Sequence, residues 1–170
     1  MGKIALTQIP LYLIVRPSGL PFLDEIKTFV SEGGFDHIWE TQIPDWSNLA
    51  QAFYFDKFGD RETGKLQPGA QAWIMSTNVL FGNQAKLLVL EAKAILENVG
   101  DLGAREELVK IKRCYRAKKK ALREALTITC RHVGIDYTVF FDYIHCPDPD
   151  QSQLEYEWNW LSDNGLIEKM

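Results

Sequence analysis

The sequence has few cysteines and no long hydrophobic run, and these absences exclude several classes of protein. Its 170 residues include three cysteines, Cys114, Cys130 and Cys146, which are odd in number and widely spread. Their spacing is not that of metal ligands and favours reduced thiols. No apolar run approaches the roughly 18 residues that a membrane helix needs. We therefore expect a cytoplasmic protein without a membrane span or a structural metal.

The chain also lacks a large excess of either sign of charge. The sum of Lys and Arg is 19 and that of Asp and Glu is 23, which leaves a formal net charge of −4. This balance does not favour a nucleic-acid binder. Residues 1–8 lack the apolar core of a secretory signal. The length suits one domain, spanning 1–170, with a substantial core.

Hydrophobic periodicity predicts a first unit of strand, helix and strand. The apolar run from Ile9 to Val15 predicts a buried strand, and the Arg-Pro-Ser-Gly turn at 16–19 ends it. A helical stripe follows over 24–32, and two glycines at 33–34 close that helix. Residues 35–43 alternate apolar and polar side chains, which is typical of a half-exposed strand.

The middle of the chain predicts further alternation of helices and strands. Asp45 marks the start of an aromatic helix that contains Tyr54. A loop is predicted over 60–69 and a third strand over 71–76. A long helix is predicted over 84–98, with apolar residues along one face.

A histidine at the end of a predicted strand is the centre of the candidate site. Residues 137–144 are β-branched and aromatic, which is typical of a buried strand, and His145 follows them. The Pro-Asp-Pro-Asp turn at 147–150 precedes a predicted helix that begins at Gln151 or Ser152. This order places an imidazole close to helix N–H groups, which favour phosphate. A histidine bonded to a backbone carbonyl is the structural alternative.

These segments resemble nucleoside diphosphate kinases over most of the chain. In that family a strand ending in Ile-His leads through an aspartate to a helix with glutamate and tryptophan, as at Ile144-His145 and Asp148 here. The family opens on a strand ending in Val-Lys-Pro-Asp-Gly, which resembles 15–19, and a later Gly-Phe resembles 34–35. The resemblance implies an α/β (α+β) fold, a ferredoxin-like sandwich with a four-stranded antiparallel sheet covered by helices.

The resemblance also implies a role for each matching residue. His145 would be the nucleophile that carries the phosphoryl group, and Glu157 would orient it. Arg16 would replace the family lysine that contacts the transferred phosphate. Tyr54 would reach the nucleotide phosphates, and Asp148 matches the aspartate of the turn. Mg²⁺ would enter with the nucleoside triphosphate, bridging its phosphates.

A basic helical segment at about 104–126 has no counterpart in the family and is interpreted as an insertion. Between Lys110 and Arg123 it has eight basic residues and no acidic one. Like charges three or four apart disfavour a helix, so an anion nearby would offset them. The segment is a solvated face balanced by acids elsewhere, a clamp for nucleotide phosphates, or a nucleic-acid contact. Arg116, Arg123 and Arg131 are the candidate phosphate ligands.

Several positions depart from the family pattern. The phosphate-binding arginine is absent from 89–95, where the predicted helix should carry it. Asp142 replaces an asparagine, and Pro147 removes a serine hydroxyl and a backbone donor. The family glutamate falls near Tyr156, but a one-residue insertion would place Glu157 there and keep the apolar face of the helix buried.

Two functions are the main hypotheses from the sequence. The first is transfer of a γ-phosphoryl group from a nucleoside triphosphate to a nucleoside diphosphate through a phosphohistidine. The alternative is a catalytically weak or inactive relative that binds nucleotide or a partner protein, which Asp142 favours because a carboxylate repels phosphate. Nucleic-acid binding through the basic helix is a third. Because the family is usually oligomeric, a homo-oligomer is expected.

Overall fold

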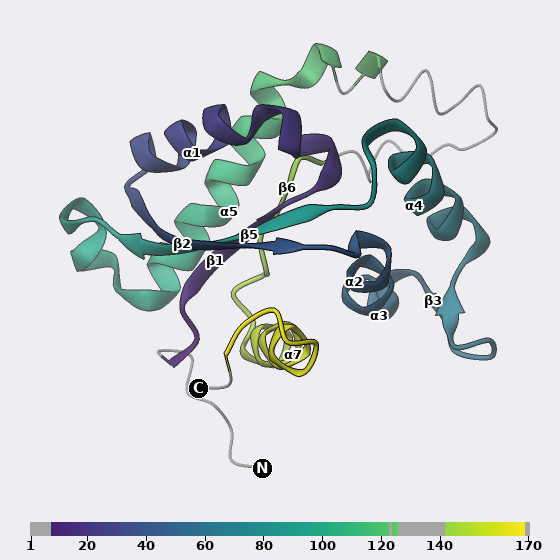
Figure 1. Cartoon of the computed structure of the whole chain (residues 1–170). Helices are drawn as coiled ribbons and strands as arrows, with labels where there is room; N and C mark the ends of the chain where they lie inside the picture. The colour runs from purple at the N-terminus through teal and green to yellow at the C-terminus, as the bar shows by residue number, and fades with distance from the viewer. Residues whose placement is uncertain (1–7, 123, 126–141, 169–170) are drawn as a thin grey trace.

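A four-stranded antiparallel sheet forms the centre of the computed structural model, which describes residues 8–122, 124–125 and 142–168 (Figure 1). The strand order is β2-β5-β1-β6, and every neighbouring pair is antiparallel. The strands are β1 (Leu11–Val15), β2 (Phe35–Ile43), β5 (Ala85–Ala92) and β6 (Ile144–His145). The predicted four-stranded antiparallel sheet is therefore confirmed.

Helices pack on both faces of this sheet because side chains of a strand alternate between its faces. Leu13 and Val15 of β1 join one apolar cluster, and Tyr12 and Ile14 join the other. The first cluster includes residues of α1 (Leu23–Glu32) and α5 (Gly100–Lys118). The second includes residues of α2 (Trp46–Phe53), α4 (Pro68–Phe81) and α7 (Gln151–Asp163). None of the helices in the described ranges has the length and hydropathy of a membrane span.

The predictions for the first unit and the last helix are confirmed. The strand predicted over 9–15 contains β1, and α1 and β2 occupy the predicted helix and strand. The middle of β2 is exposed instead of alternating, because β2 lies at an edge of the sheet. Helix α7 begins at Gln151, and the Asp150 side chain caps it by accepting the backbone N–H of Gln153 at 3.0 Å.

Two predictions for the middle of the chain are wrong. The segment 71–76, predicted as a strand, lies inside helix α4, which buries Ala70, Trp73, Ile74 and Thr77 at helical spacing. The helix predicted over 84–98 is instead β5 followed by the 3-10 helix η3 (Ala94–Val99). Because β5 is buried on both faces, its continuous apolar run fits a helix pattern as well as a strand pattern.

The predicted loop at 60–69 also contains regular structure. It contains β4 (Lys65–Leu66) and the last residue of β3 (Gly59–Asp60), which pair as a small hairpin, and its last two residues start α4. The 3-10 helix η2 (Pro17–Phe22) and the short helix α3 (Phe55–Phe58) complete the elements named here. Most of the predicted basic segment lies in α5, which packs on the sheet next to α1 (Figure 1).

The turn after β1 binds the segment that leads into β6. The backbone N–H of Arg16 donates to the Tyr143 carbonyl at 3.0 Å, and the Ser18 hydroxyl donates to the Asp142 carbonyl at 3.0 Å. A Cβ atom on Gly19 would lie 2.3 Å from the Tyr143 carbonyl oxygen, so the contact requires glycine. Most of the strand predicted over 137–144 lies outside the described residues, but β6 pairs His145 with Ile14.

We expect Leu154→Ala to lower the free energy of unfolding by about 2–5 kcal/mol, because this side chain is fully buried between α7 and the sheet. Urea denaturation followed by tryptophan fluorescence measures the change. The matched control is Leu102→Ala, whose side chain is half exposed on α5 and whose loss should cost at most about 0.5 kcal/mol. Equal losses for the two variants would contradict the packing of α7 described above.

Candidate functional site

His145 is a buried side chain at the end of β6. Only 4% of the residue is exposed, and β6 pairs it with Ile14 of the neighbouring strand β1. Its ring lies 5.5 Å from the ring of Phe53 and 5.8 Å from that of Tyr54, which meets it edge-on. The histidine is thus held by a central strand on one side and by aromatic residues of the α2–α3 region on the other.

The two ring nitrogens of His145 have different partners. Nε2 lies 3.0 and 3.1 Å from the carboxylate oxygens of Glu157, and Nδ1 lies 3.1 Å from the hydroxyl oxygen of Tyr54. The guanidinium of Arg16 donates to that same hydroxyl. Because arginine only donates and a carboxylate only accepts, the bonds have one direction for a neutral imidazole. Tyr54 donates to Nδ1, and the Nε2 proton points to Glu157, so Nδ1 holds the lone pair.

Glu157 is an ionised carboxylate in a buried position. It accepts hydrogen bonds from the Tyr12 hydroxyl at 2.9 Å and from the Gln153 amide at 3.0 Å. Burial raises the pKa of Glu157, but the electrostatic interaction with His145 and the hydrogen bonds from His145, Gln153 and Tyr12 outweigh burial and lower it. Tyr156, the alternative position, is half exposed and donates to the Ala52 carbonyl. Glu157 is therefore the acidic residue of α7 that faces the histidine.

Arg16 is a buried cation enclosed by aromatic rings. Its guanidinium carbon lies 5.2 Å from the ring centre of Tyr54, 5.6 Å from that of Trp46 and 5.5 Å from that of Trp73. Such contacts favour a cation through the electrons of the ring faces. Burial raises the pKa of Tyr54 to about 12, even though Arg16 acts in the opposite direction. Tyr54 is therefore a neutral hydrogen-bond donor near pH 7.

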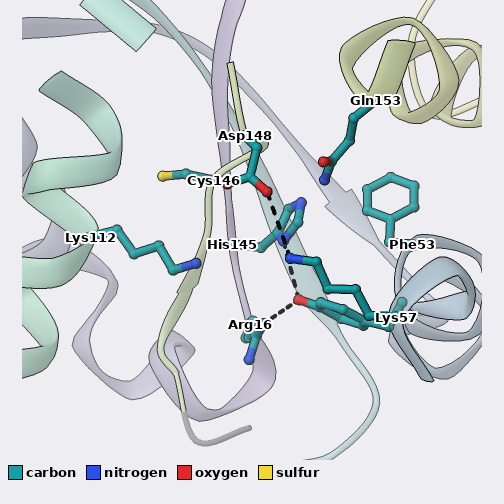
Figure 2. A pocket seen from close by; sticks show the side chains of 9 residues that line it. Arg16, Phe53, Lys57, Lys112, His145, Cys146, Asp148 and Gln153 are labelled. Atoms are coloured by element: carbon teal, nitrogen blue, oxygen red, sulfur yellow. Dashed lines mark hydrogen bonds and ion pairs between the residues drawn. The ribbon is translucent and has the colours of Figure 1, made fainter. Parts of the chain in front are cut away.

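A pocket adjoins His145 and brings several charged side chains together (Figure 2). Its free volume, counted out to the open mouth, is about 360 Å³. It is lined by Arg16, Phe53, Tyr54, Lys57, Lys112, His145, Cys146, Asp148 and Gln153. Three of these side chains are cations, and the carboxylate of Asp148 lies 3.7 Å from the ammonium of Lys57. The lining is that of an anion site, because cations outnumber carboxylates in it.

Cys146 is not expected to act as a nucleophile in this pocket, and the described acidic side chains do not form a metal-binding cluster. Burial raises the pKa of Cys146 to about 12, so its sulfur is a thiol near pH 7 and not a nucleophilic thiolate. In the described part of the chain, no group of three or more His, Cys, Asp and Glu side chains is arranged to hold a metal ion. Asp148 is the one carboxylate among the described residues that line the pocket.

The basic residues of α5 and of the turn after it mostly face acidic partners. The buried carboxylate of Asp142 lies 3.7 Å from Lys112 and 3.5 Å from Arg116. Glu25 of α1 pairs with Lys118 and Lys119. Two further pairs are Lys110 with Glu107 and Lys120 with Glu124. These contacts favour the interpretation of a face balanced by acids over that of a nucleic-acid contact.

The structure brings five of the predicted site residues together: Arg16, Tyr54, His145, Asp148 and Glu157. Arg116 is not among the residues that line the pocket, because its guanidinium is turned to Asp142. The predicted phosphate ligands Arg123 and Arg131 lie outside the described residues.

Sequence reasoning missed two cations of the pocket. Lys57 follows Tyr54 by three residues, and this spacing was a usable signal for a shared position. Lys112 was hidden among eight basic residues, although it lies four residues after Leu108, which is buried against the sheet. The supporting Gln153 lies one helical turn before Glu157, a spacing that the sequence also contained.

We expect ¹⁵N NMR of neutral His145 to show a protonated Nε2 and an unprotonated Nδ1, because Glu157 accepts from Nε2. Long-range ¹H–¹⁵N correlation spectra measure the two nitrogen shifts, and a His145→Gln variant identifies the signals. The solvent-exposed His37, whose Nε2 lies 3.1 Å from a carboxylate oxygen of Glu40, is an internal comparison in the same spectra. A protonated Nδ1 in the neutral ring would contradict the assigned direction of the hydrogen bonds.

Stability should fall as the pH drops below about 4.5, in part because of Glu157. The folded pKa of this carboxyl lies below its usual value, so the ionised group stabilises the fold above the unfolded pKa. That contribution is lost as the pH falls through the folded pKa. Glu157→Gln should therefore flatten the pH dependence of the free energy of unfolding, measured by urea denaturation between pH 7 and pH 3. Parallel curves for the two proteins would contradict this.

Comparison of the chain with protein-family models, with curated proteins and with solved structures finds no match.

Proposed function

We propose that this chain is a phosphotransferase that carries a phosphoryl group on Nδ1 of His145. The donor would be a nucleoside triphosphate and the acceptor a nucleoside diphosphate, as the resemblance to nucleoside diphosphate kinases implies. One observation supports this most: a buried carboxylate holds Nε2, Nδ1 contacts Tyr54, and both His145 and Tyr54 line a pocket with three cations. This pairing supplies a nucleophile, an orienting group and an anion site in one place.

The reaction would consist of two half-reactions at the histidine. In the first, the Nδ1 lone pair attacks the γ-phosphorus, and the bond from that phosphorus to the bridging oxygen breaks. The nucleoside diphosphate leaves with the electron pair. In the second, a terminal oxygen of another nucleoside diphosphate attacks the phosphohistidine, and Nδ1 leaves with its lone pair restored. Glu157 would stabilise the positive charge that develops on the imidazole, because it accepts from Nε2.

The remaining polar groups would act on the phosphates. Arg16, Lys57 and Lys112 surround the pocket, and cations there stabilise the negative charge of the transferred group. The Tyr54 hydroxyl occupies Nδ1 without ligand and would turn to donate to a phosphate oxygen. Mg²⁺ bound to the substrate would neutralise part of the phosphate charge, and Asp148 would help to hold it.

The arrangement of the strands supports the same assignment. Two strand–helix–strand units, β1-α1-β2 and β5-α5-β6, interleave so that β5 lies between β1 and β2. This order is the one expected of a ferredoxin-like sandwich, which we include in the proposal together with a single domain over 1–170. A homo-oligomer and a cytoplasmic location stay predictions of the resemblance and of the sequence.

A nucleotide-binding module without turnover is the second candidate. The Tyr54 hydroxyl favours it, because at 3.1 Å it occupies the nitrogen that would attack phosphorus. Pro147 favours it as well, because proline lacks a backbone N–H beside the site. In this candidate the cations would bind phosphate groups, and His145 would form no covalent bond.

We expect incubation with γ-³²P-labelled ATP and Mg²⁺ to label His145. Phosphohistidine is lost in acid and kept in alkali, so gel analysis under both conditions identifies the linkage. His145→Ala should abolish the label, whereas the control His37→Ala, on the edge strand β2, should keep it. Addition of a nucleoside diphosphate should then remove the label as a triphosphate.

Three outcomes separate the two candidates. Label that persists in acid, or in His145→Ala, would place the phosphoryl group on another residue and reject the mechanism. Absence of label, in protein that unfolds cooperatively and is stabilised by nucleotide, would leave the binding module. Label that an added nucleoside diphosphate cannot remove would restrict the activity to the first half-reaction.

A further inference from the structure

The anion site proposed above has a carboxylate directly behind it. Asp142 is 5% exposed, and its Oδ1 accepts the backbone N–H of Tyr143 at 3.1 Å. Its Oδ2 lies 3.7 Å from Nζ of Lys112 and 3.5 Å from Nη1 of Arg116. One buried negative charge thus attracts two cations of α5, and one of them lines the pocket beside His145.

Lys112 is placed between two possible anions. Figure 2 shows its side chain extending from α5 toward the centre of the pocket, on the side of Arg16 and His145. Its distance from Asp142 exceeds that of a hydrogen bond, so the attraction is electrostatic and leaves the ammonium donors available to a ligand. Burial lowers the pKa of Lys112, and Asp142 opposes that effect by favouring the charged form. A lysine stem can turn its ammonium from one partner to the other.

We propose that Asp142 is the anionic partner of Lys112 when no ligand is bound, in the role that a phosphate takes when one binds. Without ligand, Asp142 holds Lys112 at the pocket. When a phosphate group binds beside His145, the ammonium of Lys112 turns from Asp142 to the phosphate. Lys112 is then a phosphate-contacting residue, and Asp142 is a positioning residue that lowers the affinity for anions. Arg116 keeps the carboxylate paired after Lys112 has turned. This inference rests on the proposed function for the presence of phosphate at this pocket.

The proposal reverses the expected effect of removing a buried charge. Asp142→Asn keeps an oxygen for the Tyr143 N–H and nearly the same shape, but it removes the anion that competes for Lys112. We expect it to tighten the binding of inorganic pyrophosphate about fivefold, on the order expected from one partly screened like charge. Adding Lys112→Gln to this variant should abolish the gain, because the released cation is absent.

Isothermal titration calorimetry with inorganic pyrophosphate, at constant ionic strength, measures these affinities. The matched control is Glu25→Gln, which removes one carboxylate that faces the same helix through Lys118 and Lys119. Neither lysine lines the pocket, so the control should leave the affinity unchanged despite an equal change of net charge. Urea denaturation of each protein should show Asp142→Asn to be less stable, since a buried ion pair is lost.

If Asp142 had a purely structural role, Asp142→Asn would lower both the free energy of unfolding and the affinity for pyrophosphate. The direction of the affinity change therefore distinguishes the two roles. Unchanged or weaker binding by Asp142→Asn, or a full gain in the double variant, would overturn the proposal. Tighter binding without any phosphohistidine would uphold it while rejecting catalysis at His145. Labelling of His145 with no effect of Asp142→Asn would leave the proposed function standing alone. No pyrophosphate binding by any variant, together with no labelling of His145 by ATP, would reject both.

Discussion

The hydrogen bond between His145 and Glu157 is the contact on which the rest of the site depends. It joins strand β6 to helix α7, and both side chains are almost fully buried. A buried carboxylate is strongly destabilising unless it is paired and hydrogen-bonded. Tyr12 of β1 and Gln153 of α7 supply the further donors, so the centre of the sheet and the last helix meet around one carboxylate. With Nε2 fixed in this way, Nδ1 is the ring nitrogen that bonds to the hydroxyl of Tyr54, a residue that lines the pocket.

The turn after β1 places a second charge beside this pair. Arg16 lies in that turn among three aromatic rings, and the same turn binds the segment before β6 through two hydrogen bonds to its carbonyls. One short stretch of chain therefore positions the cation and the histidine relative to each other. Gly19 lies so close to the Tyr143 carbonyl oxygen that a single added carbon atom at Gly19 would push the turn and the segment before β6 apart. Charge at the pocket is also balanced locally, since Asp142 faces Lys112 and Arg116 from behind.

The elements with local signals could be predicted, whereas those with ambiguous periodicity could not. Turn residues mark the end of β1 at Val15, the end of α1 at Glu32 and the start of α7 at Gln151, and these three boundaries agree with the structure. In contrast, β5 is apolar on both faces, so its continuous apolar run fits a helix as well as a strand. The apolar run at 72–75, inside the 14-residue helix α4, is too short to show a helical period, so the pattern predicts a strand there. The error at β5 had a consequence for function. The phosphate-binding cation was sought at 89–95, in β5 and η3, whereas the helix that reaches the pocket is α5.

The sequence by itself determined the chemical groups: a histidine after a strand, an arginine in a proline turn, and a glutamate on the buried side of the last helix. These follow from local periodicity and turn chemistry. Only the tertiary structure decided that they meet, because Arg16, Tyr54 and His145 are separated by 38 and 91 residues. Pairing of β1 with β6 joins Arg16 to His145, and packing of α2 on the sheet adds Tyr54. The tertiary structure also decided that Lys112 faces the pocket while Arg116 faces Asp142. A helix has an inner and an outer face only once it packs against something, and eight basic residues in one segment cannot reveal which will point inward.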